Sequence, residues 1–303
     1  MGSFNQQFIF SLLIIGLGYL LKRTHWFKDN DGEAVARVIF NVTLPALIVV
    51  SFHNLVFEPS LMLLVVAGIV FGFLFAYLGI RLFRNESKGI KGMLIMMLPG
   101  YNIGLFAYPL VEGFWGADGV KYFGMFDVGN AFIVFGLAYL LGSFYSEDDV
   151  TFTVKDMVKK LSNSIPLVTY FVIFILNFIN FSIPDLILDT ASILAGANMP
   201  LSLLLLGMYM NFNFNKEYVR LITKYVSIRY GVGLFIGILI FFFLPIEMMI
   251  RNTLLIGMIL PMPLSLLPYS VEFGYDKQFV GTTSNVTMLL SFFLIWMIGN
   301  FVF

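Results

Sequence analysis

Leu98-Pro99-Gly100-Tyr101-Asn102 is the first of two proline-containing segments that determine how this chain folds, and Leu260-Pro261-Met262-Pro263 is the second. Each lies inside an apolar run, where a proline removes a helical hydrogen bond and clashes with the preceding turn. In hydrocarbon, such breaks persist only where protein or a polar cavity satisfies the freed backbone groups. Interrupted helices at matching places in two repeats are typical of the binding site of a transporter. The sequence therefore predicts a carrier.

The composition is that of a membrane protein. Of 303 residues, 59% are hydrophobic and 12% are charged, whereas average soluble domains carry about a quarter charged residues. The 35 Phe and 14 Tyr fit a lipid-facing surface with aromatic belts. A formal net charge of zero gives no sign of a nucleic-acid partner, and a chain without Cys forms neither disulfides nor thiolate sites. We expect an all-α integral membrane protein whose partner is the lipid bilayer.

Apolar runs of about 17–25 residues mark membrane spans. Ten are expected, at 4–21, 34–56, 59–83, 92–111, 120–142, 165–181, 186–210, 221–243, 246–271 and 279–302. Connections after odd-numbered spans carry sixteen Lys and Arg, and connections after even-numbered spans carry two, Lys121 and Arg251. Because basic residues stay on the cytoplasmic side, both termini are expected outside a cell (inner) membrane.

The two halves of the chain carry similar residues at corresponding positions. The matched pairs are Asn41 with Asn198, Gly68 with Gly233, Pro99 with Pro261, and Asn130 with Asn285. Five spans per half reverse the direction of entry, which predicts two inverted five-helix repeats, 1–142 and 166–303, with broken, crossing helices 4 and 9. The cytoplasmic connection 143–165 fits either a short amphipathic helix or a solvated linker.

Polar and small residues around the breaks are the candidate substrate-binding groups. The half-helix after each break points its positive end towards the centre, where an anionic group can sit. The residues are Pro99, Gly100, Tyr101, Asn102 and Gly104 at the first break, Pro261, Pro263 and Ser265 at the second, and Asn41 and Asn198 beside neighbouring prolines. The alternative is that Pro and Gly merely kink packed helices.

Asp127 is the one carboxylate placed clearly inside a span, with Asn130 three residues further on the same helix face. A charged Asp at such depth costs roughly 2.5–3.5 kcal/mol and needs a partner or a proton. Asp127, Asn130, Ser284 and Asn285 are therefore candidate sites for a coupling ion, H+ or Na+. A structural carboxyl near an outer vestibule, and helix packing by Ser284 and Asn285, are the alternatives. Neither a cofactor nor a metal site is expected.

No Lys or Arg is expected at mid-membrane depth, since Arg37 and Arg229 are placed one or two turns from the inner face. A bound anion would then rest on helix ends and amides. A neutral or weakly acidic substrate stays open.

The chain resembles the auxin efflux carrier family in its compact prokaryotic form. The motifs are Asn41-Val-Thr-Leu-Pro45-Ala, Asn102-Ile-Gly104 leading to Tyr108-Pro109-Leu110, Asp127-Val-Gly-Asn130, Asn198-Met-Pro200-Leu and Glu272-Phe-Gly-Tyr275-Asp276. The resemblance covers essentially the whole chain and implies a fold related to the bile acid–sodium symporters. It implies a scaffold of helices 1, 2, 6 and 7 and a transport domain of helices 3–5 and 8–10.

Members of that family move organic anions: auxin in plants, malate or malonate in bacteria. The long central loop of the plant proteins is missing here, and Leu264-Ser265 stands where a second Asn like Asn102 would be. We therefore expect a secondary active transporter of a small organic anion that works by alternating access. A non-transporting membrane sensor on a carrier fold is the alternative, and a homodimer is compatible with both. An enzyme is not expected, because the spans hold no catalytic constellation.

Overall fold

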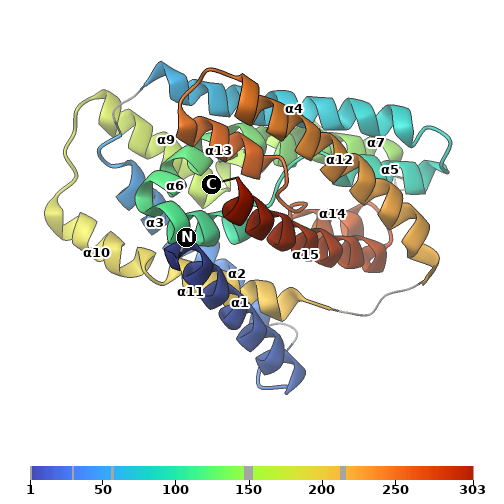
Figure 1. Ribbon diagram of the computed structural model, residues 1–303, viewed down its shortest axis with the longest axis horizontal. Coiled ribbons are helices and arrows are strands. Elements are labelled where there is room, and N and C mark those ends of the chain that lie inside the picture. The colour runs from blue at the N-terminus through green and yellow to red at the C-terminus, as the bar shows by residue number, and fades with distance from the viewer. Residues whose placement is uncertain (1, 29–30, 56–57, 147–152, 212–215, 303) are drawn as a thin grey trace.

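The computed structural model describes residues 2–28, 31–55, 58–146, 153–211 and 216–302, and every regular element in these ranges is a helix (Figure 1). Seven of the described helices are long and apolar enough to cross a membrane, or eight if the bent pair at 155–162 and 165–178 is one span. Large apolar side chains, among them Leu13, Phe73 and Phe235, are exposed on the outside of the bundle. The molecule is thus an all-helical, multi-pass membrane protein.

The helices of the first half run from the N-terminus to the central connection. They are α1 (Gly2–Arg23), α2 (Asp31–Val38), η1 (Ile39–Thr43), α3 (Leu44–Phe52), η2 (Pro59–Leu61), α4 (Met62–Leu82), α5 (Lys88–Met97), η3 (Ile103–Ala107), α6 (Tyr108–Phe132), η4 (Ile133–Ala138) and α7 (Tyr139–Tyr145). Here η1, η3 and η4 are π-helical turns, and η2 is a 3₁₀ turn.

The second half begins with the helix in the central connection. Its elements are α8 (Val154–Ser162), α9 (Ile165–Phe178), α10 (Asp185–Ala195), α11 (Asn198–Tyr209), the 3₁₀ turn η5 (Lys216–Tyr218), α12 (Val219–Phe243), α13 (Met248–Gly257), α14 (Leu266–Glu272) and α15 (Lys277–Phe301).

Two of the π turns lie directly before a proline. Thr43 ends η1 two residues before Pro45, and Ala107 ends η3 two residues before Pro109. A proline lacks the N–H and crowds the carbonyl four residues back, so the preceding turn widens. Each π turn shifts the helical register, which changes the direction in which its residues point.

The chain folds back on itself at Gly116, within the segment labelled α6. Gly116 has a φ of 61° and a ψ of −142°, outside the helical range. A Cβ on Gly119 would lie 2.4 Å from the carbonyl oxygen of Val111. Eight residues of continuous helix would separate these positions by about 12 Å. The two arms of α6 are therefore antiparallel, which brings Tyr108 close to Asp127.

Both ends of the chain lie on the same face of the molecule. Asn5 near the start of α1 donates to Asn300 near the end of α15 at 2.8 Å, and Asn300 donates back at 3.1 Å. Figure 1 marks the two termini in the same region of the fold. The start of α1 and the end of α15 therefore lie side by side.

Glycines permit the closest helix pairs. In the pair α1 and α11, a Cβ on Gly207 would lie 2.0 Å from the carbonyl oxygen of Ile15. In the pair α4 and α6, a Cβ on Gly129 would lie 2.1 Å from the carbonyl oxygen of Val65. These backbones touch directly, which is the small-residue packing that membrane helices use.

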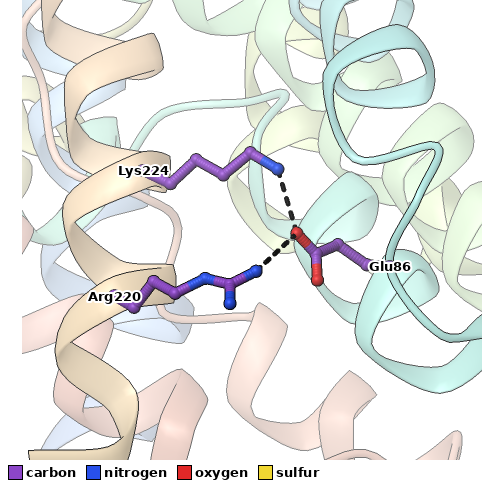
Figure 2. A network of polar contacts seen from close by, with 3 residues as sticks. All are labelled: Glu86, Arg220 and Lys224. Carbon is purple, nitrogen blue, oxygen red and sulfur yellow. Dashed lines mark hydrogen bonds and ion pairs between the residues drawn. The ribbon is translucent and has the colours of Figure 1, made fainter.

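An ion-pair network joins the turn after α4 to α12 (Figure 2). Glu86 Oε1 lies 2.9 Å from Lys224 Nζ and 3.9 Å from Arg220 Nη2. The Glu86 side chain is largely buried, whereas that of Arg220 is exposed. We therefore expect the contact with Lys224 to contribute more than that with Arg220, since exposed pairs contribute little.

The connection 143–165 contains α8, and residues 147–152 of it lie outside the described residues. Thr153 and Asp156 form a capping box at the start of α8. Near its end, Lys160 lies 3.9 Å from the ring centroid of Tyr139 and 3.7 Å from Glu272 Oε2. The helix is thus fastened to the ends of α7 and α14.

Substituting Gly129 by Ala tests the direct contact of α4 with α6. Because the new methyl group has no space beside the Val65 carbonyl, we expect a loss of about 1–3 kcal/mol of stability. Gly231 on α12 is the matched control, since no heavy atom lies within 4 Å of its added Cβ. Gly231→Ala should leave the melting temperature of the purified protein unchanged or raise it. Equal melting temperatures for the two variants would contradict the packing.

Candidate functional site

The two helix breaks meet in the interior. The first separates α5, which ends at Met97, from η3, which begins at Ile103. The second separates α13 from α14, between residues 257 and 266. The backbone N–H of Asn102 donates to the carbonyl of Pro261 at 2.9 Å. This bond joins the two breaks, and we call the region around it the crossing.

Arg229, from the middle of α12, places its guanidinium on the carbonyls of both breaks. At the first break, Nη1 donates to Leu98 O at 2.7 Å and Nη2 to Gly100 O at 2.8 Å. At the second, Nη2 donates to Leu260 O at 3.0 Å and to Pro261 O at 3.3 Å, and Nε donates to Leu260 O at 3.3 Å. The side chain is 0% exposed. One buried cation thus satisfies four carbonyls that helix breakage leaves free.

No Lys or Arg was expected at mid-membrane depth, and Arg229 was placed one or two turns from the inner face. Its guanidinium instead lies at the two breaks, because a long side chain reaches well beyond its own backbone position. A signal was present: Arg229 lies inside the apolar run 221–243, and an ionisable residue inside a span marks a functional position with a specific partner.

Two further carbonyls at the ends of the breaks also have side-chain partners. Tyr225 Oη donates to Met97 O at 2.7 Å, and Ser291 Oγ donates to Ile259 O at 2.6 Å. The ring of Tyr101 lies 4.9 Å from the guanidinium carbon of Arg229, within the range of a cation–π contact. Polar side chains from several helices therefore hold the backbone of the crossing in place.

Asn130 holds the first break from the side of α6. Its Oδ1 accepts from the N–H of Tyr101 at 2.8 Å, and its Nδ2 donates to the carbonyl of Tyr101 at 3.0 Å. The same Nδ2 also donates to Asp127 Oδ1 at 3.2 Å. The side-chain amide thus replaces the helical partners that Tyr101 lacks and connects them to Asp127.

Asp127 is half-buried beside two tyrosines. Tyr108 Oη donates to Asp127 Oδ2 at 3.0 Å, and Tyr108 shares a further hydrogen bond with Tyr170 of α9. Both oxygens of the carboxylate therefore accept hydrogen bonds from neighbouring side chains. These hydrogen bonds lead from the crossing, through Asn130, Asp127 and Tyr108, to Tyr170 on α9.

Two buried polar atoms near the crossing have no hydrogen-bond partner. They are Nδ2 of Asn102 and Oγ of Ser284. Asn102 uses its Oδ1 to accept from the N–H of Leu105 at 3.4 Å. Ser284 is linked to the second break through Thr287, which donates to Ser284 O at 2.8 Å and accepts from Met262 N at 3.4 Å. A bound ligand would find an unused donor in Asn102.

Other predicted site residues have different surroundings. Pro263 packs against Gly100, Gly104 faces Phe40 of η1, and Ser265 directly precedes α14. Asn198 Oδ1 accepts from Thr43 at 3.1 Å, while Asn285 donates to Asn211 O at 2.9 Å. Asn41 is exposed. Among the described residues, no hydrogen bond joins Asn41, Asn198 or Asn285 to either break.

An open cavity of about 870 Å³ lies at the adjoining ends of α3 and α9. Its walls are His53, Asn54, Leu55, Phe174, Asn177, Phe178, Asn180, Phe181 and Ser182. None of these residues belongs to a break. Size alone therefore does not identify it as the functional site, and the polar groups of the crossing are the stronger candidate.

Comparison with known proteins identifies relatives among membrane transporters. The model of a family described as membrane transport proteins matches residues 4–298. The chain is 27% identical to an uncharacterized transporter of Methanothermobacter thermautotrophicus over 224 residues, 72% of each chain. It is 24% identical to an uncharacterized transporter of Methanocaldococcus jannaschii over 210 residues, 66% of this chain and 67% of the relative.

Proposed function

Because this chain belongs to the membrane transport protein family, the auxin efflux carrier family that its motifs resemble, we propose that it is a secondary active transporter of a small organic anion. The family consists of transporters and not of enzymes. In this proposal the protein works by alternating access, with the substrate at the crossing of the two broken helices. A carboxylate such as malate or malonate, or an auxin-like acid, is the proposed class of substrate.

The charge of Arg229 is the observation that carries the anion proposal. Among the described residues, its guanidinium forms no ion pair with a carboxylate, and its partners are neutral carbonyls. The half-helix that begins after Asn102 adds the positive end of its dipole. Together with the unused Nδ2 of Asn102, these groups favour a negatively charged ligand.

We propose ten membrane spans arranged as two inverted repeats. Seven helices qualify by length and composition. Dividing the helix at Gly116 adds one span, α9 adds a second, and the interrupted α13–α14 adds a third, so that seven plus three gives ten. The hydrogen bonds between Asn5 and Asn300 support an even number. The Lys and Arg distribution then supports termini on the outside.

The packing supports a division into a scaffold and a transport domain. α1 packs on α11, and α3 packs on α9 and α10, which are elements of the proposed helices 1, 2, 6 and 7. α4 packs on α6, and α12 packs on α13, which are elements of the proposed transport domain. The crossing, Arg229 and Asp127 all belong to the second group, so a rigid movement of that group would carry the site.

Asp127 is the proposed coupling group, taking up H+ or Na+. Its hydrogen bonds to Asn130 and Tyr108 connect it to the first break and, through Tyr170, to the scaffold. A change in its charge would alter the strength of both contacts, because hydrogen bonds to an ionised carboxylate are roughly twice as strong as neutral ones.

Substituting Asn102 by Ala tests the substrate site. If Nδ2 binds the anion, its removal should reduce uptake of labelled malate, malonate or indole-3-acetate into proteoliposomes about tenfold or more. Asn54→Ala, on an exposed residue, is the control and should transport normally. Normal uptake by Asn102→Ala would contradict the assignment, and binding without any flux in the unmodified protein would favour the sensor.

Substituting Asp127 by Asn tests coupling. The amide binds no proton and carries no charge, so the imposed H+ or Na+ gradient that accelerates uptake by the unmodified protein should no longer do so. Asp118→Asn, in an exposed position of α6, should keep the dependence on the gradient. The same gradient dependence in Asp127→Asn and in the unmodified protein would count against the proposal.

Labelling of introduced cysteines tests the ten-span topology, because the natural chain contains no Cys. An impermeant maleimide added to intact cells should react with cysteine at exposed positions 54 and 182 (Asn54→Cys and Ser182→Cys). It should react at positions 87 and 163 only after the membrane is opened (Ser87→Cys and Asn163→Cys). The reverse pattern, or labelling of all four in intact cells, would exclude this topology.

A further inference from the structure

We propose that Arg229 is a tethered cation, which fills at the crossing a carbonyl cage of the kind that binds a mobile coupling cation in other carriers. The crossing therefore needs no Na+ of its own. What the inference implies about ion coupling rests on the proposed transport function. The presence of the carbonyl cage is independent of that function, because binding of cations alone tests it.

The cage consists of backbone oxygens from two separate chain segments. Leu98 O and Gly100 O come from the first break, and Leu260 O and Pro261 O come from the second. In carriers with discontinuous helices, unwound carbonyls of this type coordinate Na+. Here all four point at one guanidinium, at 2.7 to 3.3 Å. The oxygens that would bind a hard cation are already used by a side chain.

The chemistry of arginine makes this arrangement permanent. A guanidinium is a cation that carries five N–H donors and no acceptor, so carbonyl oxygens suit it as partners. Its rigid fork presents donors in one plane, and here they reach both breaks at the same time. Burial of a lone charge is costly, and the four carbonyls together with the Tyr101 ring supply the compensation.

A tethered cation has a different consequence from a mobile one. Na+ arrives from one side of the membrane and leaves on the other, which ties the state of the site to a sodium gradient. Arg229 stays on α12, which packs against α13 and belongs to the same proposed moving group as both breaks. The positive charge at the crossing would therefore be present in every state of the cycle, and coupling would come from another group, such as Asp127.

Chemical rescue of Arg229→Ala tests the cage directly. The variant removes the guanidinium and leaves the carbonyls in place, so its melting temperature should fall well below that of the unmodified protein. Methylguanidinium chloride should then raise the melting temperature of Arg229→Ala relative to choline chloride at the same ionic strength. The three Trp residues provide the fluorescence signal for detergent-solubilised protein.

Arg251→Ala is the matched control. Arg251 also donates to a helix carbonyl, that of Phe241 at 3.1 Å, but it lies away from the breaks. Methylguanidinium should stabilise neither Arg251→Ala nor the unmodified protein. Stabilisation of all three proteins alike, or of none, would overturn the proposal.

A measurement on Asp127→Asn, in which Arg229 is intact, keeps the inference falsifiable even if Arg229→Ala does not fold. Because this variant lacks the proposed coupling carboxylate and no cation site is free at the crossing, NaCl and choline chloride at equal ionic strength should give it the same melting temperature. A rise specific to Na+ in Asp127→Asn would overturn the proposal. None of these readouts involves a substrate. If no anion is transported, the proposed function is refuted, while the proposal that Arg229 fills a carbonyl cage still stands.

Discussion

The hydrogen bonds between the Arg229 guanidinium and the carbonyls of Leu98, Gly100, Leu260 and Pro261 are the contact on which the rest of the fold depends. Two interrupted helices in hydrocarbon leave carbonyls unpaired, and a buried arginine is equally unfavourable alone. The guanidinium supplies hydrogen-bond donors to the carbonyls, and the carbonyls stabilise the buried charge. The cation also stands between segments that are more than a hundred residues apart in the chain, and so fixes how the two halves meet.

A second set of polar contacts extends from this centre. Asn130 takes the place of a helical turn for Tyr101 and bonds to Asp127, which in turn accepts from Tyr108. Tyr108 then meets Tyr170 on α9. The proposed transport domain and scaffold are thus connected through hydrogen bonds that end on a carboxylate. If Asp127 gains or loses charge during a transport cycle, the strength of the hydrogen bonds between the proposed transport domain and scaffold changes as well.

Features that depend on neighbouring residues in the chain, such as the helix breaks, are predicted well from this sequence. Pro99 and Pro261 interrupt their helices because the effect of a proline acts within one turn. Arg229 was missed because its partners lie 31 to 131 residues away in the chain, at positions that only the folded structure brings together. Asn41 was expected near the site and is exposed. It lies inside the π turn η1, which changes the helical register on which such a prediction depends. Asn285 repeats Asn130 in sequence but bonds to Asn211, because the second break is held by Arg229, Ser291 and Thr287 instead.

A cryo-electron microscopy map of the protein in a lipid nanodisc would show whether Arg229 joins the two breaks inside the membrane. We expect continuous density from the Arg229 side chain to the carbonyls at 98–100 and 260–261, with both breaks at the middle of the lipid layer. Breaks at different depths, or a guanidinium directed to the aqueous surface, would contradict it.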